Sequence, residues 1–95
     1  MTPEASSDVE TIFDYIARDS PQNAATVAAV LIAAVDSLSQ FPHRYKVHRS
    51  SRDPNRVIRS MPVPPYVVYY RSNEDDGTVH VLTIRHGSRR QPGSL

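Results

Sequence analysis

Apolar side chains in the first forty residues recur at the spacing of α-helices. In the first segment they lie three or four residues apart, which places them along one face of a helix. Thr2 can cap this helix with its hydroxyl, and Pro3 suits the first helical position. Asp8 is expected on the opposite, polar face. The apolar positions are Ala5, Val9, Ile12, Phe13, Ile16 and Ala17.

A second helix is predicted from Pro21 to about Gln40. Asp19, Ser20 and Pro21 stop the first helix and start the second, with Ser20 as the cap. So short a connection makes the two helices an antiparallel hairpin. The inner apolar stripe of the second helix comprises Ala24, Val27, Ala28, Leu31, Ile32, Val35 and Leu38.

After residue 42 the pattern changes from helical to extended. Residues 43–56 are polar and basic, and they predict a surface connection with a short extended piece at residues 45–48. Beyond this connection, apolar runs between turn residues predict three strands. These strands span residues 57–61, 66–71 and 78–86. Because proline cannot donate a hydrogen bond into a ladder, Pro62 is expected to end the first of them.

These elements predict an α+β fold, with an N-terminal antiparallel helical hairpin packed on a C-terminal antiparallel sheet of three or slightly more strands. A chain of 95 residues has room for one core, so residues 1–95 are expected to form a single domain. Cysteine is absent and the four histidines are scattered, so no disulfide, metal or other cofactor is expected. No membrane span or signal peptide is recognisable, which favours a cytoplasmic protein.

The net charge of +1 conceals a division along the chain. Residues 1–40 carry six acidic side chains and one basic side chain, whereas residues 41–95 carry ten basic and four acidic ones. Summed charge of one sign creates a potential that attracts phosphates or an acidic protein partner. Nine of the ten cations are arginines, whose planar fork can hold a carboxylate or phosphate with two hydrogen bonds.

The last strand leads into a cationic sequence that directs the functional interpretation. This sequence is Arg85-His86-Gly87-Ser88-Arg89-Arg90. Two helices, then strands, then this cationic end resemble the RelE/ParE superfamily, the toxins of bacterial type II toxin-antitoxin pairs. The resemblance covers essentially the whole chain.

Members of that superfamily carry a strand before the first helix, whereas this chain opens with residues 2–5, which match the positions just after that strand. The resemblance therefore implies a sheet edge that lacks a strand and is open to pairing. An upstream extension of about seven residues, the length of a short strand, is expected to raise the melting temperature.

The resemblance implies one of two activities. RelE-like members cut messenger RNA on the ribosome, which requires a base for the ribose 2′-hydroxyl, an acid and cations. ParE-like members inhibit DNA gyrase, apparently without catalytic residues of their own. The nuclease members carry an arginine at the place of Tyr66, a closing arginine at the place of Arg89 and an aromatic residue near Leu95. Only Arg89 keeps the expected type, so the nuclease set is incomplete.

His86 is the strongest single candidate for chemistry, because it ends a strand among arginines. Non-nuclease members also carry a histidine here, so a binding role is favoured over a catalytic one. Tyr66, Tyr69 and Tyr70 are interpreted as core residues, with stacking on bases as the alternative.

The sequence thus predicts a ParE-like toxin that inhibits DNA gyrase and is neutralised by a ParD-like or other small antitoxin. One alternative is a ribosome-dependent endoribonuclease using His86, Arg89 and the basic connection around Lys46. Another is a basic nucleic-acid-binding module. The predicted target- or antitoxin-binding residues are Arg59, Arg71, Arg85, His86, Arg89 and Arg90.

Overall fold

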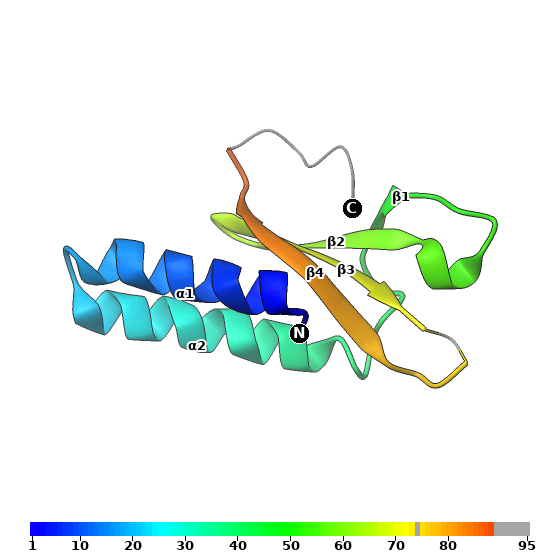
Figure 1. The fold of residues 1–95 in the computed structure, drawn as a ribbon, viewed down its shortest axis with the longest axis horizontal. Coiled ribbons are helices and arrows are strands. Elements are labelled where there is room, and N and C mark those ends of the chain that lie inside the picture. The colour runs from blue at the N-terminus through cyan, green and yellow to red at the C-terminus, as the bar shows by residue number, and fades with distance from the viewer. Residues whose placement is uncertain (74, 89–95) are drawn as a thin grey trace.

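The structure, a computed structural model, describes residues 1–73 and 75–88, and it contains a helical hairpin followed by a sheet (Figure 1). The helices are α1, Pro3–Ala17, and α2, Pro21–Ser37. The strands are β1, Lys46–Arg49, β2, Ile58–Val63, β3, Tyr66–Ser72, and β4, Val79–His86. A short 3₁₀ helix, η1, Pro54–Arg56, lies between β1 and β2. The predicted α+β class is confirmed.

Both helices begin where the sequence predicts. The Thr2 Oγ1 accepts a hydrogen bond from the Ala5 amide at 3.2 Å, and the Ser20 Oγ accepts one from the Asn23 amide at 3.2 Å. These bonds satisfy amide groups that have no partner within the helix. The predicted end of α2 at Gln40 is wrong, because the helix ends at Ser37. The amides of Leu38 and Gln40 bond three residues back, and these tighter turns stop the α-helical ladder.

The four strands form one antiparallel sheet in the order β1-β2-β3-β4. The extended piece predicted within the basic connection is β1. The expectation that Pro62 ends a strand is wrong, because Pro62 lies inside β2 and pairs with Val67 of β3. β1 pairs with β2 only at Ile58, Arg59 and Ser60. Among the described residues, β2 therefore has no second strand neighbour beyond Ser60 to which Pro62 would have to donate.

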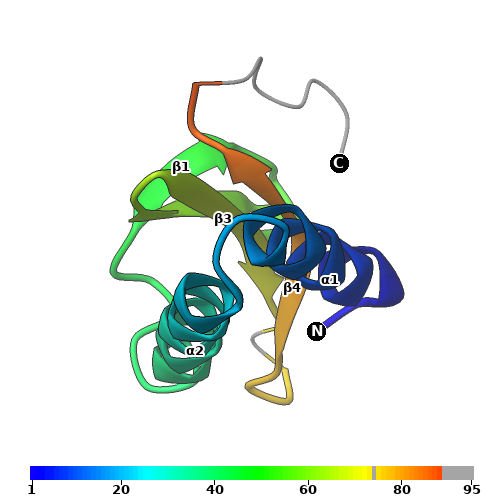
Figure 2. The same cartoon turned by 90° about the vertical axis from the view of Figure 1, so that its left-hand side faces the viewer.

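The two helices lie side by side on one face of the sheet (Figures 1 and 2). The core lies between the helices and that face, and Tyr70 is its largest side chain. Burial raises the pKa of Tyr70 above the usual value of 10.0. Its hydroxyl donates a hydrogen bond to the Pro42 carbonyl at 2.8 Å, so the polar group is satisfied. The buried members of the core are Ala5, Leu31, Leu38, Met61, Val68, Tyr70, Val81 and Ile84.

Within residues 1–73 and 75–88, β4 forms one edge of the sheet and has a strand neighbour on one side only. The start of α1 is tied to it, because the Thr2 amide and Thr2 Oγ1 both donate to the Val81 carbonyl, at 3.2 and 2.6 Å. Among the described residues, this edge is therefore partly covered by side chains and backbone of α1 rather than by a strand.

We expect Tyr70→Phe to lower the free energy of unfolding by about 1 kcal/mol, the usual net value of one hydrogen bond. The substitution keeps the ring in the core and removes only the bond to Pro42. Urea unfolding at neutral pH measures the difference. Tyr15→Phe is the matched control, since Tyr15 is 71% exposed. An equal loss in both variants would contradict the assignment.

Candidate functional site

A cleft between α1 and the end of β4 contains His86 and Arg85. It encloses about 400 Å³. Both walls carry aromatic or apolar side chains, and both carry polar groups, Asp8 and Thr11 on the α1 side and Arg85, His86 and Ser88 on the β4 side. The lining residues are Asp8, Thr11, Ile12, Tyr15, Tyr66, Ile84, Arg85, His86 and Ser88. This combination suits a partially apolar ligand that carries a polar or charged group.

Ser88 contacts one ring nitrogen of His86 through both its backbone amide and its hydroxyl. The Ser88 backbone amide donates to His86 Nδ1 at 3.2 Å, and the Ser88 Oγ lies 2.7 Å from the same nitrogen. An amide can only donate, so Nδ1 must supply its lone pair. The amide contact favours the neutral tautomer with the proton on Nε2, whereas the Ser88 hydroxyl can bond Nδ1 in either tautomer. The Tyr66 ring packs against His86 edge to face, with the ring centroids 5.6 Å apart.

Gly87 closes the end of the sheet beside this histidine. Its amide donates to the Pro65 carbonyl at 2.7 Å, across the turn that joins β2 and β3. A Cβ atom at Gly87 would lie 3.1 Å from that oxygen. Only glycine allows this close approach without a shift, which explains why a glycine follows His86 in the cationic sequence.

Arg85 is attached to α1 through a buried hydroxyl. Its Nε donates to Thr83 Oγ1 at 3.1 Å, and Thr83 Oγ1 donates to Asp8 Oδ2 at 2.7 Å. The same carboxylate oxygen accepts the Ile84 amide at 3.0 Å. Thr83 is fully buried. Burial raises the pKa of Tyr69 on the neighbouring strand, and the charge of Arg85 opposes part of that rise.

The prediction that Asp8 faces solvent on the polar side of α1 is wrong. Asp8 follows Ala5 by three positions and precedes Ile12 by four, which is the spacing of the face that packs on the sheet. That spacing was the available signal. The prediction followed the general preference of carboxylates for water instead. In the structure, the carboxylate accepts two hydrogen bonds from β4. Sequence reasoning missed Asp8, Thr83 and Ser88 as parts of the site.

The structure brings together only part of the predicted binding set. Of that set, Arg85 and His86 share the cleft, and Tyr66 lies beside them. Arg59 lies elsewhere, and its Nη1 donates to the carbonyls of Tyr45 at 2.9 Å and His43 at 3.4 Å. Its guanidinium therefore holds the basic connection against β2, and Arg59 does not line the cleft.

The other predicted cations are further along the sheet or cannot be placed. Arg71 pairs with His80 at the opposite end of β3 from His86. Lys46 lies on β1 opposite Ser60. Arg89 and Arg90 fall outside the described residues, as does Leu95. Within the described ranges, Arg85 is thus the one predicted cation that lines the cleft.

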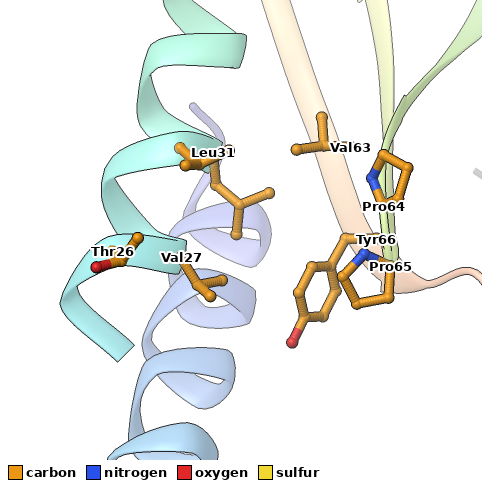
Figure 3. A pocket seen from close by; sticks show the side chains of 8 residues that line it. Thr26, Val27, Leu31, Val63, Pro64, Pro65 and Tyr66 are labelled. Carbon is orange, nitrogen blue, oxygen red and sulfur yellow. The ribbon is translucent and has the colours of Figure 1, made fainter. Parts of the chain in front are cut away.

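A smaller pocket of about 130 Å³ lies between α2 and the turn after β2 (Figure 3). Thr26, Val27 and Leu31 face the turn residues Pro64 and Pro65 across it. This pocket is almost entirely apolar and carries no charged side chain. It offers a place for an apolar group but no chemistry.

Residues 1–73 and 75–88 contain no cluster of three or more histidines and carboxylates that could hold a metal ion. In the same part of the chain no helix has the length and apolar character to cross a membrane.

Comparisons with known proteins agree on one family. Residues 1–91 match the family model described as ParE toxin of type II toxin-antitoxin system, parDE. Toxin RelE2 of Caulobacter vibrioides is 36% identical over 88 residues, which cover 93% of this chain and 92% of RelE2. Y4kP of Sinorhizobium fredii is 31% identical over 87 residues, covering 92% and 84%.

A solved structure shows the same fold. It belongs to the chromosomal ParDE toxin-antitoxin system of P. aeruginosa and superposes with a TM-score of 0.68. The two chains are 22% identical, and the match covers 90% of this chain and 89% of the other.

We expect Asp8→Ala to destabilise the protein by about 1–3 kcal/mol, because the Thr83 hydroxyl and the Ile84 amide would each lose their acceptor. Urea unfolding measures the loss. Asp14→Ala removes an exposed carboxylate from the same helix and is expected to change the stability by less than about 0.5 kcal/mol. Equal effects of the two substitutions would show that the bonds to β4 contribute nothing specific.

Proposed function

This chain belongs to the ParE toxin family of type II toxin-antitoxin systems, and we propose that it acts as a ParE-like inhibitor of DNA gyrase that a cognate antitoxin neutralises. The matching family model is named ParE, whereas one relative of this chain is named RelE2. The choice between gyrase inhibition and RNA cleavage therefore depends on the site. The state of His86 is the observation that carries the proposal.

A ribonuclease mechanism requires a group that accepts the proton of the ribose 2′-hydroxyl. A histidine can do this only through a nitrogen with a free lone pair. In His86 that nitrogen is Nδ1, and it already accepts the Ser88 amide. With Nδ1 as the acceptor, the other nitrogen, Nε2, carries the proton and can only donate. This arrangement supports a binding role for His86 and disfavours a general base.

The composition of the cleft supports the same choice. Tyr66 stands where the resemblance to RelE-like nucleases places an arginine, and its ring packs on His86. A cleaving enzyme needs several cations to stabilise the charge that develops on the phosphate. Among the described residues that line the cleft, Arg85 is the only arginine or lysine, and Asp8 lies on the same surface.

The proposed antitoxin is a small protein with an acidic segment. Its support is the excess of arginine in the second half of the chain, together with the ParDE system to which the solved structural relative belongs. Exposed arginines provide charge-assisted hydrogen bonds to carboxylates. Arg71 and Arg85 are exposed in the described structure, and they are the cations we assign to this contact.

Growth inhibition through DNA damage and filamentation is the expected effect of expression without antitoxin. Toxicity is expected to be lost in the variant carrying both Arg89→Ala and Arg90→Ala, because target binding needs the cationic end of the chain. His86→Ala is expected to keep most of the toxicity, because no proton transfer is involved. The purified proteins are assayed for inhibition of gyrase supercoiling and for cleavage of messenger RNA on ribosomes. Ribosomal cleavage that His86→Ala abolishes, with supercoiling unaffected, would replace this proposal with the nuclease.

Arg85→Ala is expected to weaken binding of a co-expressed antitoxin by about tenfold or more, the usual effect of losing a hydrogen bond between charged groups. Titration calorimetry of the purified proteins measures the affinity. Arg18→Ala, which removes an exposed arginine beyond the end of α1, is the matched control and is expected to bind normally. An antitoxin whose affinity is the same for both variants would contradict the assigned contact.

A further inference from the structure

The hydrogen bonds around Thr83 have only one possible direction. The hydroxyl of a threonine has a single proton. Asp8, as a carboxylate, can only accept, so that proton lies between Thr83 Oγ1 and Asp8 Oδ2, at 2.7 Å. The lone pairs of the hydroxyl then face the Nε of Arg85, which donates at 3.1 Å. The negative charge on α1 thus polarises a buried hydroxyl toward the arginine of β4.

This chain of bonds fixes which edge of Arg85 a ligand can use. A guanidinium offers two edges for a paired contact with a carboxylate, one formed by Nε and one nitrogen of the terminal pair, the other by Nη1 and Nη2. The Nε edge is occupied by Thr83. Within residues 1–73 and 75–88, Nη1 and Nη2 have no hydrogen-bond partner, and Arg85 is exposed. Only the terminal edge is therefore available.

We propose that Asp8 and Thr83 are positioning residues that hold Arg85 as a pre-oriented fork for one carboxylate of a partner peptide, bound in the cleft between α1 and β4. The inference rests on the proposed function in one respect, because the antitoxin is the partner that would supply this carboxylate.

A single carboxylate fits the cleft better than a nucleic-acid backbone does. Asp8 lines the same cleft as Arg85, so the two side chains nearly cancel each other in charge. A chain of phosphates would find one cation and one anion here, whereas strong phosphate binding uses several cations. Ile12 and Tyr15 provide apolar surface for the rest of a peptide side chain. The local chemistry is that of a peptide anchor.

Pre-orientation increases affinity because a free arginine loses rotamer freedom when it binds. Ordering one such side chain reduces affinity by roughly twofold to tenfold, and a side chain that is already held avoids much of this loss. Thr83 is fully buried and Asp8 is bonded to the Ile84 backbone, so the tether is itself rigid. Thr83, which is buried, therefore acts on affinity through Arg85 and without touching the ligand.

The test compares variants by NMR on ¹⁵N-labelled protein, following the Nε–H signal of Arg85. Thr83→Val removes the hydroxyl and keeps the shape, so this signal is expected to move to the position of a free arginine and to exchange with water several-fold faster. Thr83→Ser keeps the hydroxyl and should preserve the signal. Thr26→Val is the matched control, because its hydroxyl bonds only within α2, to the Gln22 carbonyl. An Arg85 signal unchanged in Thr83→Val would overturn the proposal.

Two small probes then identify the ligand chemistry. N-acetylaspartate presents a peptide-like carboxylate, and dimethyl phosphate presents the diester of a nucleic acid. We expect N-acetylaspartate to shift the Arg85 signal more strongly, with an affinity that falls roughly threefold to tenfold in Thr83→Val and is unchanged in Thr26→Val. Tighter binding of dimethyl phosphate would overturn the carboxylate assignment.

Should Thr83→Val fail to fold, Asp8→Asn takes its place. An amide oxygen is a weaker acceptor than a carboxylate, so the Thr83 hydroxyl is less polarised and the Arg85 Nε–H is expected to exchange faster. Unchanged exchange in a folded Asp8→Asn protein would equally overturn the proposal. Because these readouts need no antitoxin, a failure of antitoxin binding alone would affect the proposed function and leave the positioning role standing.

Discussion

The carboxylate of Asp8 is the contact on which the arrangement of this protein depends. It joins α1 to the edge of the sheet by accepting the Thr83 hydroxyl and the Ile84 amide. A half-buried carboxylate is costly without such partners, so these bonds, together with those of Thr2 to Val81, fix where the helix lies along β4. With α1 in this place, the cleft forms between α1 and the end of β4. The Thr83 hydroxyl, which is bonded to Asp8, also accepts a hydrogen bond from Arg85 and so orients its side chain. One interaction therefore links helix packing, the sheet edge and the orientation of the exposed cation.

Much of the fold could be predicted from the sequence, because its elements are set by local rules. Thr2, Pro3 and Ser20 specify the helix starts through capping, and the apolar runs specify the strands. The errors arise where the bounds of an element depend on residues that are distant in sequence. Pro62 is tolerated inside β2 because β1 pairs only as far as Ser60, a fact of topology. The end of α2 depends on a turn that buries Leu38.

The site was harder to predict for the same reason. Arg85 and His86 could be chosen because they are adjacent in a cationic sequence. Their partners Asp8 and Thr83 are more than seventy residues apart and meet only through the fold. Arg59 looked equivalent to Arg85 by residue type, yet it bonds two backbone carbonyls of the basic connection. The sequence shows how many arginines the chain has. Only the structure shows which of them bond to the protein's own backbone and which are exposed to a partner.

The protonation of the His86 ring distinguishes a residue that binds a partner from a general base that cleaves RNA. Long-range ¹H–¹⁵N NMR of the neutral ring distinguishes a protonated nitrogen from one with a free lone pair. If His86 has a binding role, Nε2 carries the proton and Nδ1 accepts from Ser88. A proton found on Nδ1, with a free lone pair at Nε2, would contradict it and leave His86 able to act as a general base.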